Sequence, residues 1–173
     1  RTGLDMLNWF SQSPQSDSVV ITGASTGIGA ACALALDKLG YRVFAGVRHS
    51  ADGERLQQQA GPRLMPIRLD VTDAASISAA SHTVAAMVGE RGLAGLVNNA
   101  GIGVAGPIEL LPLADWRRQF EVNVFGLIAV TQTFLPLIRT GRGRIINMGS
   151  IAGRASMPFM APYAASKHAL EAI

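Results

Sequence analysis

Short apolar runs alternate along the chain with longer segments whose apolar residues recur at helical spacing. The apolar runs predict five strands, at residues 19–21, 42–47, 64–69, 93–97 and 144–148. The segments between them predict helices at residues 29–39, 51–60, 73–88 and 112–138, and a last helix that begins at Tyr163. Strands that alternate with helices favour a parallel sheet covered by helices on both faces. The predicted fold class is therefore α/β, with a doubly wound parallel sheet.

The length of 173 residues fits one domain with a substantial core. No internal repeat or low-complexity linker divides the chain. We expect an N-terminal tail over residues 1–17 and a dinucleotide-binding domain over residues 18–173. Because the chain begins with Arg1 and stops at Ile173 inside an apparent helix, we also expect this domain to be incomplete at its C-terminus.

Composition excludes several classes of protein. Apolar residues make up 49% and charged residues 16% of the chain, which excludes a disordered polymer. No apolar run approaches the roughly 18 to 20 residues of a membrane span. The net charge is +3 and the basic residues are scattered apart from Arg142 and Arg144 in a glycine-rich loop, so we expect no nucleic-acid binding. Cys32 is the only cysteine, and the three histidines lack ligand spacing, so we expect no metal and a cytoplasmic protein.

A glycine-rich turn, Gly23-x-x-x-Gly27-x-Gly29, lies between the first predicted strand and the first predicted helix. Glycine accepts positive φ and lets a pyrophosphate approach the backbone, while the helix N-terminus offers free N–H groups and partial positive charge. A glycine cluster alone is often only a tight turn. In this strand–turn–helix setting we expect a nucleotide cofactor, held by Gly23, Ser25, Thr26, Gly27, Ile28 and Gly29.

The end of the second strand bears on the choice of cofactor. NAD-binding proteins commonly place an acid about 20 residues after the glycines, where it holds the ribose 2′-hydroxyl. Here Val47 is followed by Arg48 and His49, and an arginine favours a 2′-phosphate. We therefore favour NADP(H), while Asp52 leaves NAD(H) open and Arg48 could also be a solvated strand-end charge.

Polar residues also end the third and fourth strands. Asp70, followed by Val71, could accept a hydrogen bond from an adenine amino group, or could only form the turn. Asn98 begins the sequence Asn-Asn-Ala-Gly, where the sheet order should reverse and leave a crevice. Asparagine side chains there can tie strands together, and Ala100 and Gly101 leave room for a ribose. We expect all five residues to contact the cofactor.

Tyr163 and Lys167 stand four residues apart, so both project from one face of the last helix. Reduction of a carbonyl needs a proton for the developing alkoxide, but a free tyrosine has a pKa of about 10. A neighbouring cation favours the phenolate, so that the tyrosine can act as acid in reduction and as base in oxidation. Such a pair is common on ordinary helices; its coincidence with the glycine turn makes catalysis the favoured interpretation.

These residues, with Asn123 and Ser150, occur in an order and at spacings that resemble the short-chain dehydrogenase/reductase superfamily, across nearly the whole chain from Val19. Segments at residues 106–109, 120–124 and 134–136 look most like its retinol, hydroxysteroid and 3-hydroxybutyrate dehydrogenase branch. The resemblance implies a Rossmann-type fold and an oxidoreductase that interconverts an alcohol and a carbonyl compound.

The resemblance also implies roles for single residues. Lys167 would bond the nicotinamide ribose, and Ser150 would donate to the substrate oxygen. Asn123 would belong to a proton relay at a locally disturbed stretch of helix, and Asn98 would stabilise the sheet. Family members form homodimers or homotetramers, which we expect of the full protein.

Apolar residues near the predicted site suggest an apolar substrate, although they could simply pack the loops: Ile102, Val104, Met157, Phe159 and Met160. A nucleotide-binding fragment without turnover is the alternative function, because the resemblance implies two further strands and a mobile loop after Ile173. We therefore expect the isolated chain to be unstable or inactive.

A sugar-nucleotide epimerase shares the Tyr/Lys chemistry but has different glycine spacing. A G-x-S-x-G hydrolase is disfavoured because glycine is missing two residues before Ser150.

Overall fold

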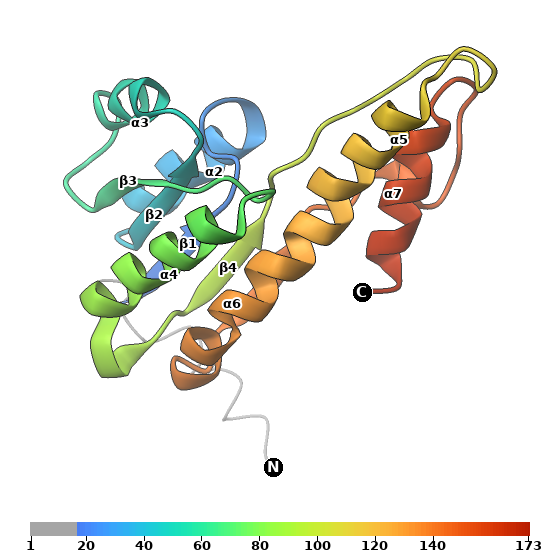
Figure 1. The fold of residues 1–173 in the computed structure, drawn as a ribbon. Coiled ribbons are helices and arrows are strands. Elements are labelled where there is room, and N and C mark those ends of the chain that lie inside the picture. Colours follow the sequence, from blue (N-terminus) through green and yellow to red (C-terminus); the bar gives the residue numbers. More distant parts are fainter. Residues whose placement is uncertain (1–16) are drawn as a thin grey trace, which may run out of the picture.

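The computed structural model describes residues 17–173, and within them five parallel strands form one sheet in the order β3-β2-β1-β4-β5 (Figure 1). The strands are β1 (Ser18–Ile21), β2 (Arg42–Val47), β3 (Leu64–Arg68), β4 (Gly95–Asn98) and β5 (Arg144–Asn147). The order reverses between β1 and β4, where a doubly wound sheet opens a crevice at the carboxyl ends of its strands. The predicted fold class is confirmed, and the tail predicted over residues 1–17 lies outside the described residues except for Asp17.

Helices cover both faces of the sheet. They are α2 (Gly27–Lys38), α3 (Ser50–Gln57), α4 (Ala74–Val88), α5 (Leu113–Phe120), α6 (Leu127–Thr140) and α7 (Ala161–Glu171), with the short segments η3 (Gly89–Arg91), η4 (Glu121–Gly126) and η5 (Ile151–Gly153). Helices α4 and α6 share one face of the sheet, and α2 and α3 share the other (Figure 1). Helix α7 lies beside α5 and η4, beyond the sheet.

Local sequence signals explain most of these boundaries. The Asp73 carboxylate accepts hydrogen bonds from the backbone N–H groups of Ala75 and Ser76, and so caps α4 as predicted. Gly40 follows α2 with φ of 94°, a conformation that favours glycine. The prediction for the last helix was two residues late, because α7 begins at Ala161 and accepts a proline in its first turn.

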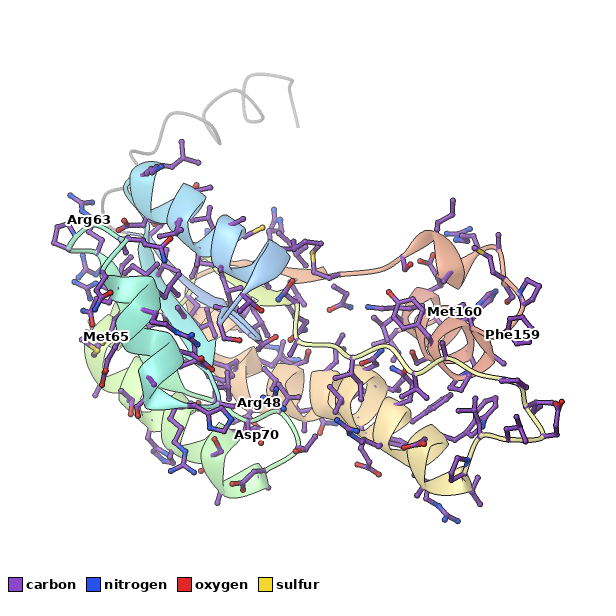
Figure 2. The ribbon with its side chains drawn as sticks, turned by 90° about the horizontal axis from the view of Figure 1, so that it is seen from above. Arg48, Arg63, Met65, Asp70, Phe159 and Met160 are labelled. Carbon is purple, nitrogen blue, oxygen red and sulfur yellow. The ribbon has the colours of Figure 1, made fainter. Side chains whose placement is uncertain are left out.

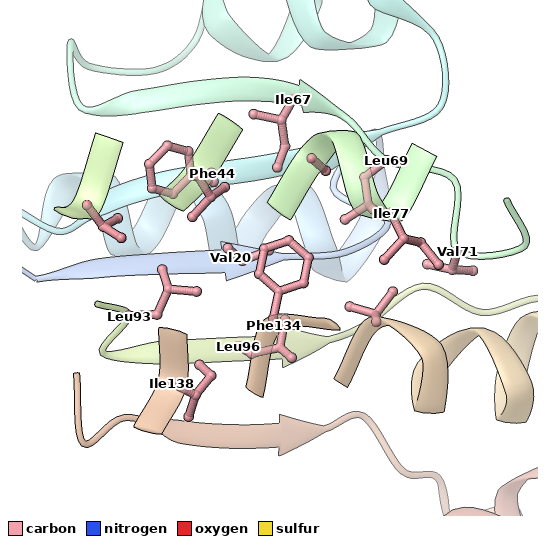
Figure 3. Packing of buried hydrophobic residues seen from close by; sticks show 14 residues of the cluster. Val20, Phe44, Ile67, Leu69, Val71, Ile77, Leu93, Leu96, Phe134 and Ile138 are labelled. Atoms are coloured by element: carbon pink, nitrogen blue, oxygen red, sulfur yellow. The ribbon is translucent and has the colours of Figure 1, made fainter. Parts of the chain in front are cut away.

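The core is divided between the two faces of the sheet. On the α4 and α6 face, Val20, Phe44, Leu96 and Phe134 are fully buried and pack together (Figure 3). On the α2 and α3 face the buried cluster is Val19, Ile21, Ala24, Ala33, Val43, Ala45, Leu56, Leu64 and Val97. Cys32 is partly buried at the margin of that second cluster. Apolar packing on both faces fixes the strand ends that form the candidate site.

The predicted long helix is continuous from Leu113 to Thr140 but changes its winding at η4, a π-helical segment. By length and composition its 28 residues could cross a membrane, which the sequence analysis did not anticipate. Its buried residues include Leu127, Val130 and Ile138, and α6 packs on α4 and β4. The core helix of a globular domain meets the same criterion, and 39% of the most apolar stretch of 18 residues is buried inside the described fold.

Candidate active site

A cleft of about 350 Å³ opens at the carboxyl ends of β1, β2, β3 and β4. It is lined by Gly23, Ser25, Thr26, Ile28, Gly29, Gly46, Val47, Arg48, Leu69, Asp70, Val71, Thr72, Asn99, Ala100, Gly101, Ile102 and Val122. Most of the residues predicted to hold a cofactor are therefore brought together. Gly27, Asn98, Tyr163 and Lys167 do not line this cleft.

The glycine turn has the shape expected of a phosphate cradle. Gly23 has φ of 64°, and a Cβ added there would lie 2.7 Å from the Cα of Ala100, so the turn and the end of β4 pack backbone against backbone. Gly27 has φ of 59°, and a Cβ added there would meet nothing within 4 Å. Thr26 caps α2 without a side-chain hydrogen bond, so the first N–H groups of the helix are free for an anion. The turn and the helix end fit a dinucleotide pyrophosphate.

The second asparagine of the Asn-Asn-Ala-Gly sequence holds the turn in place. The Asn99 side-chain amide donates to the carbonyl oxygens of Thr22 and Gly23, at 3.0 Å each. The Thr22 hydroxyl oxygen accepts from the backbone N–H groups of Asn99 and Ala100, at 3.0 and 2.9 Å. The predicted link between strands through asparagine side chains is thus made here by Asn99.

Asn98 points to the other side, toward β5. Its side-chain amide donates to Thr131 Oγ1 at 2.9 Å and to Asn147 Oδ1 at 3.0 Å. Asn98 Oδ1 is buried without a hydrogen-bond partner in the described part of the chain. The side chain joins β4, β5 and α6, which is the sheet-stabilising role that the resemblance implied.

Arg48 and Asp70 lie close together at one end of the cleft (Figure 2). Burial opposes ionisation of Asp70, but hydrogen bonds from Thr72 and the charges of Arg48 and Arg68 outweigh it and lower the pKa of the carboxyl group. The Asp70 carboxylate accepts from the Thr72 backbone N–H at 2.9 Å and from its hydroxyl at 2.8 Å. Asp70 therefore forms the turn after β3, and it also faces the cleft, so both predicted roles remain compatible with its position.

A larger concavity of about 520 Å³ lies beyond Arg48, along the outer edge of β3 and against α3. It shares Val47 and Arg48 with the cleft but contains none of the predicted catalytic residues. The chemistry of the glycine turn therefore identifies the smaller cleft as the candidate cofactor site. Within residues 17–173, no cluster of His, Cys, Asp and Glu side chains could hold a metal ion.

Tyr163 and Lys167 share one face of α7, as the sequence predicted. The Lys167 Nζ lies 5.8 Å from the centre of the Tyr163 ring. Lys167 is only 7% exposed, and its burial lowers the pKa of the ammonium group below the ordinary 10.5. Its Nζ donates to the Met148 carbonyl oxygen at 2.5 Å, which ties α7 to the residues that follow β5. The sequence analysis did not anticipate this contact, because nothing in the sequence marks a backbone acceptor.

Ser150 lies two residues after Met148 and caps η5. Its hydroxyl oxygen accepts from the Ala152 backbone N–H at 3.1 Å. This bond uses an oxygen lone pair and leaves the hydroxyl hydrogen available to donate. Ser150 thus lies two residues after the carbonyl group that anchors Lys167, with its hydroxyl hydrogen available to donate.

Asn123 lies in the π-helical segment η4, and its carboxamide bonds three groups. Its Oδ1 accepts from the Ile102 backbone N–H at 2.9 Å, and its Nδ2 donates to the Ile102 carbonyl oxygen at 3.0 Å and to Ser166 Oγ at 3.1 Å. The Ser166 hydroxyl donates to the Tyr163 carbonyl oxygen at 2.7 Å. The disturbed helix expected around Asn123 is therefore observed, and its side chain links the loop after β4 to the start of α7.

Gln119, four residues before Asn123, is a polar residue that the sequence analysis missed. It is fully buried, and its side chain bonds the backbone of Ile102 and Val104. A glutamine and an asparagine four residues apart on an otherwise amphipathic helix is the signal that could have drawn attention to it.

The apolar residues expected near the substrate lie on two loops. Phe159 and Met160 lie at the far end of the molecule from Arg48 (Figure 2), whereas Ile102, on the loop after β4, lines the same cleft as Arg48. The Gly106 backbone N–H donates to the Phe159 carbonyl oxygen at 2.7 Å and joins the loops. Phe159 has φ of 68°, which is unusual for a bulky residue, and its side chain is 63% exposed. Met157 is similarly exposed, whereas Ile102 and Val104 are partly buried.

Comparison with known proteins agrees with this geometry. The family model described as short chain dehydrogenase matches residues 17–173. The chain is 44% identical over 154 residues to dehydrogenase/reductase SDR family member 9 of Bos taurus, covering 88% of this chain and 48% of that protein. It is 41% identical to 17-beta-hydroxysteroid dehydrogenase type 2 of Homo sapiens, covering 88% and 40%, and 42% identical to retinol dehydrogenase 16 of Mus musculus, covering 91% and 50%. The chain thus spans about half the length of these curated relatives.

Solved structures share the arrangement of the strands and helices. A gluconate 5-dehydrogenase from Burkholderia cenocepacia in complex with NADP and tartrate matches with a TM-score of 0.81 at 30% identity, covering 92% of this chain and 65% of that one. An NAD+-bound xylitol dehydrogenase matches with a TM-score of 0.86 at 28% identity, covering 93% and 63%. One of these neighbours binds NADP and the other NAD+, so the likeness does not distinguish the two cofactors.

Proposed function

Because the chain belongs to the short-chain dehydrogenase family, we propose that the whole protein is an oxidoreductase that interconverts an alcohol and a carbonyl compound with a nicotinamide cofactor. The observation that supports the proposal is a glycine turn in a cleft at the carboxyl ends of the strands, together with a Tyr163–Lys167 pair whose lysine bonds the carbonyl oxygen of Met148, just after β5. Either feature alone has an ordinary structural explanation. Together they supply the two things that the reaction needs, a cofactor cradle and a proton donor.

The residues fit a dinucleotide at one end and a carbonyl group at the other. The turn from Gly23 to Gly29 and the N-terminus of α2 would hold the pyrophosphate, and Ala100 and Gly101 would leave space for the ribose. When bound, a nicotinamide cofactor supplies or accepts the hydride. The protein's own part is to bind it, to orient the substrate and to move a proton.

Tyr163 would exchange that proton with the substrate oxygen. The Lys167 ammonium group lies near the phenol ring and is held by the Met148 carbonyl oxygen, so a positive charge is fixed where it favours the phenolate. Ser150 would direct its free hydroxyl hydrogen at the substrate oxygen and stabilise the charge that grows there. Asn123 would keep the loop after β4 and the start of α7 in register.

Replacing Tyr163 with Phe tests this mechanism. General acid–base groups contribute about 10²- to 10⁴-fold to a rate, so we expect kcat to fall by that factor while the affinity for the cofactor is retained. The measurement is oxidation of NADPH and NADH by the whole protein against steroid, retinoid, aliphatic and acyl carbonyl compounds. Tyr41→Phe, the same change at the chain's other tyrosine, is the matched control. A fully active Tyr163→Phe variant would eliminate the acid role.

Within this function we propose NADP(H) as the cofactor, with NAD(H) as the alternative. Arg48 is exposed at the end of the cleft where the adenosine ribose would lie, and no acid occupies the position after β2. A hydrogen bond to a charged group is worth about 1.5–3 kcal/mol, so Arg48→Ser should weaken NADPH binding by about 10- to 100-fold and leave NADH binding unchanged. Titration of the two cofactors by fluorescence tests this, with Arg91→Ser as a control at an exposed arginine outside the cleft. Tighter binding of NADH by the unaltered protein would refute the assignment.

We propose an apolar alcohol or carbonyl substrate, because partly buried and exposed apolar side chains flank Tyr163 on two loops. The curated relatives include proteins named for hydroxysteroids and retinol, which are apolar alcohols. A homodimer or homotetramer of the whole protein is part of the same proposal. A nucleotide-binding protein without turnover is the alternative, and the activity panel separates the two.

A further inference from the structure

The segment from Gly101 to Ala105 follows β4 without regular secondary structure, and no strand pairs with it in the described residues. It is held instead by two carboxamide side chains, those of Gln119 and Asn123. We infer that Gln119 is a positioning residue for the proposed reaction: it fixes Gly103 against Tyr163, and so sets where the phenol lies relative to the cofactor cleft. This inference rests on the proposed function.

The hydrogen bonds of Gln119 define a specific geometry. Its Nε2 donates to the Ile102 carbonyl oxygen at 2.7 Å, and its Oε1 accepts from the Val104 backbone N–H at 2.7 Å. Asn123 bonds both backbone groups of Ile102, at 2.9 and 3.0 Å. Asn123 bonds only Ile102 of this segment. Gln119 bonds Val104 as well, so the helix holds two residues of the segment instead of one.

Gly103 lies between the two residues that Gln119 bonds, and the Tyr163 ring lies beside it. A Cβ built on Gly103 would lie 3.8 Å from Tyr163 Cδ2. Gly101 and Ile102 line the cofactor cleft at the same time. The segment thus lines the cleft with its first two residues and lies beside the Tyr163 ring at its third.

Because Gln119 is buried, its hydrogen bonds to the segment are hard to replace. The side chain is 0% exposed, so neither end of its amide can exchange a protein partner for water. If the amide is lost, Asn123 still holds Ile102, but the Val104 N–H loses its acceptor and Gly103 is free to move away from the ring. A displacement of about 1 Å near reacting groups can cost on the order of 10²-fold in rate. The cleft around the glycine turn does not depend on these bonds.

The test compares Gln119→Met with Gln58→Met in the whole protein. Methionine has nearly the volume of glutamine but makes neither hydrogen bond, and Gln58 is an exposed glutamine after α3. Kinetics use the carbonyl compound from the activity panel on which the unaltered protein is most active. We expect Gln119→Met to lower kcat by about 10- to 100-fold. We expect the dissociation constant of the cofactor to be retained, and the Val104 amide to exchange its hydrogen faster.

A second variant separates the two bonds. Gln119→Glu keeps an acceptor for the Val104 N–H but, when ionised, has no donor for the Ile102 carbonyl oxygen, so its kcat should lie between those of Gln119→Met and the unaltered protein. The inference is overturned if kcat of Gln119→Met stays within about twofold of the control. It is also overturned if cofactor affinity falls in parallel with kcat, because Gln119 would then support the fold as a whole. Absence of turnover by the unaltered protein would instead refute the proposed function, before any variant is made.

Discussion

Strands β4 and β5 are neighbours of similar apolar character, yet they are buried to very different degrees. All four residues of β4 are buried, whereas Ile145 and Ile146 of β5 are 37% and 52% exposed. Strand β4 pairs with a strand on each side, while β5 pairs only with β4 in the described residues. Burial of a strand is therefore decided by its neighbours as much as by its own sequence.

The same contrast separates the two halves of the candidate site. The cofactor cleft rests on the sheet, whose apolar clusters cover both faces. The other half, which we call the candidate catalytic corner, consists of β5, η5 and α7. In the described residues its Leu170 joins Val124 of η4 and Leu127 of α6 in a small buried cluster, and polar contacts also link the corner to its surroundings. Lys167 bonds Met148, Asn123 bonds Ser166, and Arg154 pairs with Glu171 at 2.6 Å on the surface. Within the described residues, apolar packing therefore dominates around the cleft, and hydrogen bonds and an ion pair contribute more around α7.

The largest expected effect comes from removing apolar volume in each region. Phe134→Ala empties a fully buried site under the sheet and should lower the free energy of unfolding by about 3–5 kcal/mol. Leu170→Ala in the corner should cost only about 2 kcal/mol, because that cluster is small and lies at the end of α7. Urea unfolding of the two variants measures the difference. Equal losses in the free energy of unfolding would contradict this comparison, because apolar burial would then stabilise both regions to the same extent.

A second, smaller effect concerns the charge buried in the corner. Burial lowers the pKa of Lys167, so in the folded state the ammonium group gives up its proton at a lower pH than in the unfolded chain. The unfolded chain then binds more protons, and the free energy of unfolding should rise with pH between the lowered pKa and 10.5. Lys167→Met should remove this rise. Urea unfolding at several pH values measures it, with Lys38→Met as control at the other, exposed lysine. A rise that survives in Lys167→Met would contradict the assignment.

The smallest effect lies at the opposite end of the pH scale, in the cleft. Hydrogen bonds from Thr72, with the charges of Arg48 and Arg68, outweigh burial and lower the pKa of Asp70 below 3.8. The stability that ionised Asp70 contributes is present above pH 3.8 and is lost as the pH falls through the lowered pKa. Asp70→Asn should make the loss of stability at acid pH slightly smaller. Acid unfolding followed by circular dichroism, without cofactor, measures this loss. Glu90→Gln, at an exposed carboxyl, is the control and should leave the acid loss unchanged.

Much of the site could be predicted because its residues carry local signals. A glycine turn between a strand and a helix is a pattern that predicts a phosphate cradle, and a tyrosine and a lysine four residues apart on a helix share one face of it. Asp73 likewise predicted the start of α4, which it caps. The contacts of Gln119, Asn99 and Met148 carried no such signal, because each bonds a backbone group whose position depends on the packing of distant segments.

The sequence by itself determined the alternation of strands and helices, the α/β class, and the residue types that can cradle a phosphate and exchange a proton. These follow from periodicity and side-chain chemistry, which are local properties of a chain. Only the tertiary structure decided that Asn99 rather than Asn98 holds the glycine turn, that Lys167 is anchored by a carbonyl oxygen, and that Gln119 grips the loop beside Tyr163. Such pairings join residues that are not neighbours in the chain. The pairing of β1 with β4 and the packing of the helices on their neighbours bring them within hydrogen-bond distance.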